Sequence, residues 1–285
     1  MSYIEKLSTA QKNNLDIIIK AFDEWGITND FTRAAILAII SKESMFKCDF
    51  ERGYGNTSND RIRKIFGFRA SRLSDAELTA IKKDDFKFFN LVYGGRYGNG
   101  PHEGWAYRGA DFNQITFKGN YSSAAKRTGV DLINHPEKIE NPNVAAAAAI
   151  TYFIDRFKRG FSTAHQRHYK SNGINDFGDL NNATLAIYHA NAGFGKAMYT
   201  MSKVNESTGG LKKAINRAPE FLAYVTGRII VPMPFKTKSE GDKFRNWVND
   251  NHPGYAKQIQ LDRSGSHTNA YIEKAWNKFS DEYLK

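Results

Sequence analysis

The sequence of 285 residues contains one cysteine, Cys48, and no long apolar segment. A single thiol excludes an intramolecular disulfide and a cysteine-rich zinc site, and it suits folding in a reducing cytoplasm. No His is near Cys48 in the sequence, so we interpret it as a packed, inert thiol. No apolar run approaches the ~20 residues that span a bilayer, and no signal-peptide pattern is visible. We expect no metal site, no cofactor and no transmembrane segment.

Strand signals, internal repeats and low-complexity segments are also scarce. Apolar residues instead recur at helical spacing through most of the chain, and the hydrophobic fraction of 41% is enough for a real core. The sequence therefore predicts a mainly α fold, with helices over residues 9–25, 34–40, 59–66, from 74 onward, 121–128, 143–157 and within 180–204.

A connector with two prolines, Pro232 and Pro234, indicates a domain boundary. We predict a main domain over residues 1–230 and a helical C-terminal appendage over 231–285. The appendage either packs on the main domain or is separable. Its expected helices lie near 244–247 and 271–283, where aromatic residues have helical spacing.

Basic residues exceed acidic ones by 41 to 30, which gives a formal net charge of +11. Such a balance favours polyanions: nucleic acid, anionic lipid surfaces or the anionic polymers of bacterial walls. Residues 156–170 hold several cations and no acid, which indicates either contact with an anionic polymer or a solvated basic face. No nucleic-acid-binding motif is visible, so we expect no nucleic acid partner.

The segment from Arg33 to Arg52 joins an apolar helix to a pair of carboxylates. The helix ends at Glu43, where burial should raise the pKa of the carboxyl group into the range of a general acid. Glu51 follows eight positions later. Two carboxylates, one protonated and one ionised, are the minimum equipment for hydrolysis of a glycosidic bond. The alternative is two ordinary solvated glutamates.

A second segment, Gly104 to Tyr121, holds side chains suited to sugars. An aromatic pair, Trp105 and Tyr107, is followed by polar residues in near alternation: Gln114, Thr116 and Asn120. Alternation places Gln114 and Thr116 on one side of an extended segment. Amides, hydroxyls and aromatic faces are the groups that bind sugars; the alternative is a polar loop with core aromatics.

At this segment the chain resembles the family 19 glycoside hydrolases, which include chitinases and many phage endolysins. It matches the family pattern at nine positions and departs at three (matches Gly104, Trp105, Tyr107, Arg108, Gly109, Gln114, Thr116, Asn120 and Tyr121; departures Ala110, Asp111 and Asn113). The family's His before the catalytic acid is replaced by Lys42. Further similar motifs extend the resemblance over about residues 30 to 205.

The resemblance implies a lysozyme-like, two-lobed helical fold with a central cleft and an inverting mechanism. Glu43 would protonate the glycosidic oxygen, Glu51 would activate a water on the opposite face, and Thr116 would hold that water. Asp49 and Glu103 compete with Glu51 for the role of base. The expected substrate-binding residues for acetamido sugars are Tyr107, Gln114, Asn120 and Asn191.

The leading functional hypothesis is thus a peptidoglycan hydrolase of the phage lysozyme or endolysin kind. Its partner would be the cell-wall glycan. It would reach the wall from the host cytoplasm through a holin, or as a virion component on phage tail proteins. A chitinase is the first alternative. A non-catalytic wall-binding or virion structural protein is the alternative from another class.

Overall fold

The computed structural model describes residues 3–160, 169–192, 210–227, 238–255, 275–276, 278–280 and 282–284. The chain divides into two compact units, residues 1–226 and 227–285, close to the predicted boundary after residue 230. The described elements are helices, and the β pairing within them is one isolated bridge between Ala110 and Ile115. The prediction of a mainly α fold is confirmed.

The helices of the first unit include the predicted ones, most of them with shifted ends. They also include helices that the sequence pattern did not predict, among them Phe68–Ser71, Asp85–Tyr93 and Gly210–Val225. In chain order, the described helices are η1 (Ile4–Lys6), α1 (Thr9–Glu24), α2 (Asp30–Glu43), α3 (Asn59–Phe66), α4 (Phe68–Ser71), α5 (Asp75–Ile81), α6 (Asp85–Tyr93), α7 (Lys118–Thr128), η2 (Pro136–Glu140), α8 (Pro142–Gly160), α10 (Leu180–Asn191) and α12 (Gly210–Val225). Within the described ranges, no helix is both long enough and apolar enough to cross a membrane.

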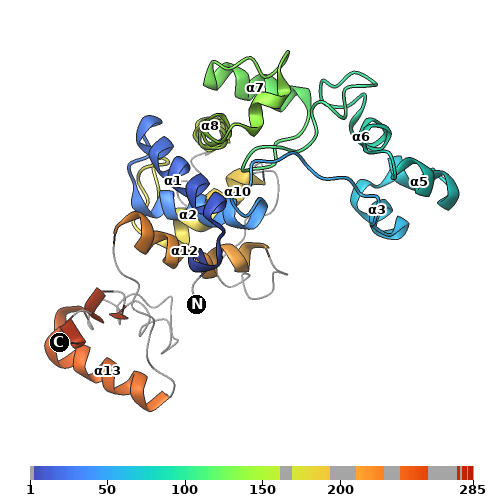
Figure 1. Ribbon diagram of the computed structural model, residues 1–285. Coiled ribbons are helices and arrows are strands. Elements are labelled where there is room, and N and C mark those ends of the chain that lie inside the picture. The colour runs from blue at the N-terminus through green and yellow to red at the C-terminus, as the bar shows by residue number, and fades with distance from the viewer. Residues whose placement is uncertain are drawn as a thin grey trace. The chain divides into compact units, whose positions relative to one another are not determined.

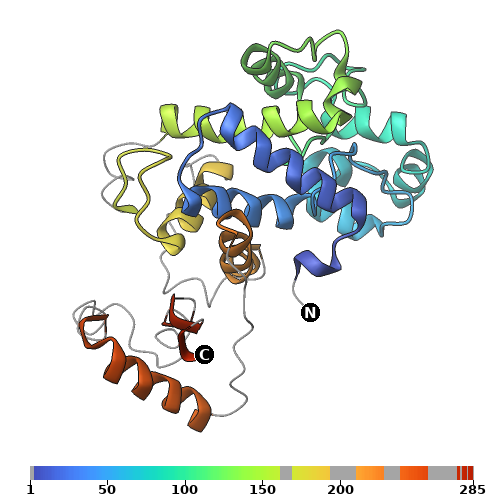
Figure 2. The same cartoon turned by 60° about the vertical axis from the view of Figure 1, so that its left-hand side comes forward.

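Helix α2 is the centre of the larger group of helices, surrounded by α1, α10 and α12 (Figure 1). Asn29 caps its N-terminus by accepting a hydrogen bond from the amide of Thr32. Every residue from Ala34 to Ser41 is buried, as expected of a helix that is apolar on nearly all sides. Figure 2 shows α1 running alongside α8, which closes another side of this core.

A second group, α3 to α6, has its own core and lies apart from α1, α2, α10 and α12 in Figure 1. Its centre is a set of mutually packed rings: Tyr54, Phe66, Phe88, Phe89 and Tyr93. The first unit therefore has two helical lobes, as predicted. A third cluster, around Tyr107, Tyr121 and Ile139, lies beneath α7 and the first part of α8.

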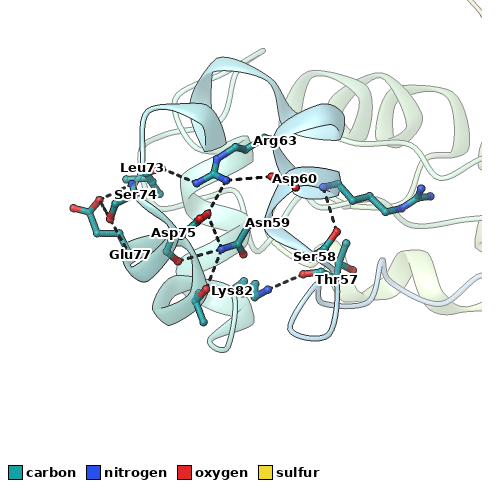
Figure 3. A network of polar contacts seen from close by, with 12 residues as sticks. Thr57, Ser58, Asn59, Asp60, Arg63, Leu73, Ser74, Asp75, Glu77 and Lys82 are labelled. Atoms are coloured by element: carbon teal, nitrogen blue, oxygen red, sulfur yellow. Dashed lines mark hydrogen bonds and ion pairs between the residues drawn. The ribbon is translucent and has the colours of Figure 1, made fainter.

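Polar contacts brace the second lobe from outside (Figure 3). The side-chain amide of Asn59, at the start of α3, donates to the backbone and side-chain oxygens of Asp75 at the start of α5, each at 3.1 Å. Arg63 contacts the same carboxylate at 2.7 Å and also donates to the carbonyl of Leu73. Because Lys82 donates to the carbonyl of Thr57 at 2.7 Å, the loop that precedes α3 is tied to the same frame.

The second unit contains α13 (Lys238–Asn251), a longer helix than the short one predicted near 244–247. Its aromatic side chains pack against rings near the C-terminus, with Phe244 and Trp276 5.0 Å apart between centroids. The unit thus has a small aromatic core of its own. Most of the basic segment 156–170 lies outside the described residues, at 161–168, as does the region 193–209.

Candidate active site

Glu43 is the last residue of α2, at the end of the buried helix where the sequence predicts the acid. Its Oε1 accepts hydrogen bonds from Lys42 Nζ at 2.5 Å and from Asn191 Nδ2 at 2.9 Å. The side chain retains 22% of its accessible surface, so the carboxylate is partly sheltered rather than enclosed. Lys42 makes an ion pair with the carboxylate that follows it in the sequence.

Asn191 is the last residue of α10, and it links this helix to α2 through its side chain and to α8 through its backbone. While its amide donates to Glu43, its carbonyl accepts from the hydroxyl of Tyr152 on α8 at 3.1 Å. The sequence places Asn191 148 positions from Glu43, so their pairing depends on the packing of α2 against α10. The prediction that Asn191 binds substrate stays a prediction, and its position beside Glu43 is compatible with it.

Glu51 is held by two tyrosine hydroxyls from the second lobe. Tyr54 donates to Oε1 at 2.6 Å and Tyr93 to Oε2 at 2.9 Å. Burial raises the pKa of both tyrosines well above the usual value, and the adjacent Glu51 raises it further. Both phenols therefore stay protonated and serve as fixed donors. A carboxylate has about four acceptor positions, so Glu51 keeps acceptor capacity for a water.

The segment from Gly109 to Thr116 lies directly against Glu51. The amide of Glu51 donates to the carbonyl of Gly109 at 2.6 Å. A Cβ on Gly109 would lie 3.2 Å from both Glu51 Oε2 and Gln114 Oε1, so the absence of a side chain permits this approach. Glu51 and Gln114 therefore converge on one small region of backbone.

Thr116 and Asn120 continue the same segment. Thr116 donates from its hydroxyl to the carbonyl of Gln114 at 3.3 Å, and Asn120 donates from its amide to the carbonyl of Thr116 at 2.7 Å. Asn120 is exposed and Thr116 is half-buried. The structure thus places the predicted polar residues in one connected group near Glu51, and their roles toward a ligand stay predictions.

Tyr107 lies elsewhere than the sequence predicts for a substrate-binding residue. It is 4% exposed, packs edge-on against Tyr121, and donates its hydroxyl to the carbonyl of Ile133. Because the core takes its ring and a backbone carbonyl takes its hydroxyl, Tyr107 presents no face to a ligand. The alternative interpretation, a core aromatic beneath a polar loop, describes this position.

The two competitors for the role of base have other surroundings. Glu103 accepts from the amide of Gly100 at 2.6 Å and from Lys118 at 2.7 Å, and these donors hold the pKa of its carboxyl below the usual value. Asp49 is exposed, and it is its backbone carbonyl that accepts from Gln114. Glu51 therefore has the better-organised environment of the three.

Asp111 belongs to the segment that lies against Glu51, and in the sequence it stands out only as a departure from the family 19 pattern. It is fully buried at a positive φ of 64°, and its Oδ1 accepts from the amides of Asn113 and Ile115. Its Oδ2 has no hydrogen-bond partner in the described structure. Burial raises the pKa of Asp111 from 3.8 to about 7, so near neutral pH the group is poised between acid and carboxylate.

Tyr54 and Tyr93 were missed as site residues. Tyr54 stands three residues after Glu51 in a loop rich in Gly, Asn and Tyr, which gave a weak signal. Tyr93 ends α6, 42 positions from Glu51, and nothing in the sequence connects the two. Both hydroxyls point out of an aromatic cluster whose composition predicts only a core.

Helix α8 contacts residues on both sides of the candidate site. Asn113, in the segment beside Glu51, donates to the carbonyl of Ala149 at 3.3 Å. Tyr152, on the same helix, donates to the residue that binds Glu43. Positions three apart share a helix face. The residue that binds Glu43 and the segment that lies against Glu51 therefore both contact α8, within one turn of each other.

Other reactive groups play no visible part here. Burial and the nearby Asp49 raise the pKa of Cys48 to about 11, and its thiol donates to the carbonyl of Glu140, as expected of a packed thiol. In the described ranges, no group of three or more His, Cys, Asp and Glu side chains is placed to hold a metal ion.

Comparison with known proteins gives a distant likeness. No family model matches the sequence, and no curated protein matches it. A solved crystal structure of a chitinase C mutant is similar, with a TM-score of 0.41 and 18% sequence identity, covering 81% of this chain and 96% of that chain. A likeness at this level assigns neither a family nor an activity.

Proposed function

We propose that the protein is a glycoside hydrolase that cuts the β-1,4 bond between acetamido sugars of bacterial peptidoglycan. The observation that carries this proposal is the contrast between the surroundings of two carboxylates, each of which has a neighbouring residue that contacts α8. Glu43 is bound by Asn191 and Lys42, whereas Glu51 is bound by two protonated tyrosines. Two carboxyl groups in different environments are what acid and base roles require.

The proposed mechanism assigns one step to each carboxyl group. Glu43 gives a proton to the oxygen of the scissile bond, so that the leaving sugar departs as an alcohol. Glu51 takes a proton from a water that attacks the anomeric carbon from the opposite face, which inverts its configuration. Thr116 holds that water, and Gln114, Asn120 and Asn191 bind acetamido groups.

The charge of the protein supports a wall polymer as the substrate. A net charge of +11 attracts an acidic polymer over a distance of about 10 Å at 0.1 M salt. Peptidoglycan carries carboxylates, whereas chitin is neutral. Within this proposal the protein acts as a phage lysozyme or endolysin, made in the host cytoplasm and released through a holin, or carried on the virion.

The test compares the full chain with Glu43→Gln and Glu51→Gln on purified bacterial walls, by release of reducing ends. We expect each substitution to lower the rate about 10²- to 10⁴-fold, the usual contribution of an acid or base. The melting temperature should be unchanged. Glu24→Gln, an exposed glutamate at the end of α1, is the matched control and should keep full activity.

Product analysis sharpens the test. NMR of the first products should show the inverted anomer, and mass spectrometry should identify the bond that is cut. Parallel assays on soluble chitin oligomers separate a wall hydrolase from a chitinase. A wild-type protein that sediments with walls but releases no reducing ends would refute the proposal and favour a non-catalytic wall-binding protein.

A further inference from the structure

A hollow of about 80 Å³ opens between α7 and α8, next to the site described above. Helix α7 contributes Asn120, Ser123 and Arg127, and α8 contributes Tyr152, Asp155 and Arg156. On α7 neighbouring members of the set are three or four positions apart, and on α8 Asp155 and Arg156 follow Tyr152 by three and four positions, so each set lies on one face. A water molecule needs about 10–15 Å³ of such space. The hollow therefore accommodates several waters or one functional group of a ligand.

The charges around this hollow leave a net positive balance. Arg127 and Asp155 form an ion pair at 3.5 Å, and Arg127 also donates to the hydroxyl of Thr151. Arg156 lies over the ring of Tyr152, 4.9 Å from its centroid, and makes no ion pair with any described residue. Stacking holds the guanidinium in place and leaves its edge as a donor for a planar anion such as a carboxylate.

The hollow is connected to both carboxylates through its own lining. Tyr152 donates to the carbonyl of Asn191, whose side chain binds Glu43. Asn120 donates to the carbonyl of Thr116, in the segment that lies against Glu51. The lining of the hollow is therefore hydrogen-bonded both to Asn191, which contacts Glu43, and to the segment that lies against Glu51.

We infer that this hollow is a subsite for a carboxylate group carried by the substrate, and that Arg156 recognises it. The inference rests on the proposed function and deepens it by naming the subsite and the residue that recognise the carboxylate of the substrate. An acidic amino-sugar polymer, with carboxylates on its lactyl groups or peptide stems, supplies a carboxylate that accepts hydrogen bonds from Arg156. A neutral polymer of the same sugars leaves the hollow to water.

The experiment measures binding in the full chain with Glu43→Gln, so that no turnover interferes. Two ligands are titrated by calorimetry: a soluble disaccharide-peptide from bacterial walls and a chitin oligomer. Arg156→Gln is expected to weaken binding of the wall fragment by about tenfold, as the loss of one charge-assisted hydrogen bond predicts. Binding of the chitin oligomer should stay the same. Arg156→Lys keeps the charge without the planar fork and should retain part of the affinity.

The matched control is Lys158→Gln, which removes one charge from the exposed part of the same helix. It should leave both affinities unchanged. Equal weakening of both ligands by Arg156→Gln, or of neither, would overturn the inference, as would a protein that binds no wall fragment. Failure of the proposed function has a different signature: the wild type would hydrolyse no wall, while the dependence of binding on Arg156 would persist.

Discussion

Glu43 and Glu51 are eight positions apart in the sequence but are supported in opposite ways. Glu43 stands at the end of a regular helix whose preceding residues are buried among α10 and α12. Glu51 stands in an irregular part of the chain. Its position depends on individual hydrogen bonds: its carboxylate accepts from Tyr54 and Tyr93, and its amide donates to the carbonyl of Gly109. Packing is spread over many contacts, whereas hydrogen bonds can be removed one at a time.

This difference indicates how each side of the site can fail. A defect beneath Glu43 should appear as lost stability of the whole lobe, because α2 is at the centre of its core. Loss of a single hydrogen bond to Glu51 should change activity first, because each bond there orients one group. The predictions below test this division, from the largest expected effect to the smallest.

The largest effect should come from Asp111, on the Glu51 side. Its pKa in the folded protein, about 7, is above its ordinary value of 3.8, so folding binds a proton between these pH values. The contribution of Asp111 to stability is therefore greatest at low pH and falls as the pH rises toward 7. Asn cannot ionise at this position. Between pH 4 and pH 7, the free energy of unfolding of Asp111→Asn should therefore rise by up to about 4 kcal/mol relative to that of the wild type.

Denaturant unfolding of both proteins across this pH range measures that difference. Asp49→Asn, at an exposed neighbouring carboxylate, is the control and should follow the wild type. Parallel pH dependence of Asp111→Asn and wild type would show that the buried carboxyl group does not titrate in this way.

Ile40→Ala tests the Glu43 side. Ile40 is fully buried, one turn before Glu43, so truncation leaves a cavity that costs about 2–5 kcal/mol. Chemical denaturation should show this loss of stability, while the rate of wall hydrolysis per folded molecule stays near that of the wild type. Ile65→Ala, at a side chain that is 48% exposed on α3, should cost less than 1 kcal/mol or so. Equal losses at both positions would contradict the central role of α2.

Tyr93→Phe and Tyr54→Phe test the bonds to Glu51. Each removes one hydroxyl while the ring remains in the aromatic cluster, so the fold should persist. Loss of a hydrogen bond to a charged acceptor is worth about 1.5–3 kcal/mol, and we expect the rate of wall hydrolysis to fall about tenfold or more.

Tyr224→Phe is the matched control, because Tyr224 donates to Asp16 at 2.8 Å in a similar tyrosine–carboxylate bond. It should leave the rate unchanged. A rate unaffected by either substitution at the site would mean that Glu51 does not depend on these donors.

Regular elements were the part of the fold that the sequence predicted well. Ser74 and Glu77 form a capping box, which is a local signal, and α5 begins directly after Ser74. The apolar run before Glu43 predicted a helix over 34–40, and α2 contains that run but begins earlier, at Asp30. The prediction for 121–128 started too late, because α7 begins at Lys118 after Phe117 at a positive φ of 77°. A bulky residue in that conformation gives no warning in the sequence.

Only part of the candidate site could be predicted from the sequence, because only some of its residues stand in local patterns. Glu43, Gln114, Thr116 and Asn120 stand in recognisable local patterns. The donors to Glu51 come from an aromatic cluster, and the burial of Asp111 follows from packing against other elements. Tyr107 is the opposite case, because it stands in a recognisable polar motif but belongs to the core. Its hydroxyl donates to the carbonyl of Ile133, which allows the ring to be buried.

The alanine-rich helix α8 has a consequence for the spacing of the site. Its anchors, Ala149 and Tyr152, are separated by three residues, or about 4.5 Å along the helix axis. That rise is a constant of the α-helix, so α8 fixes the spacing between the group that contacts Asn191 and the group that contacts Asn113. Because each residue turns the helix by about 100°, a single insertion between these anchors would face them in different directions. Within the proposed function, the spacing of the catalytic groups would thus depend on α8, a helix that need not touch the scissile bond of the substrate.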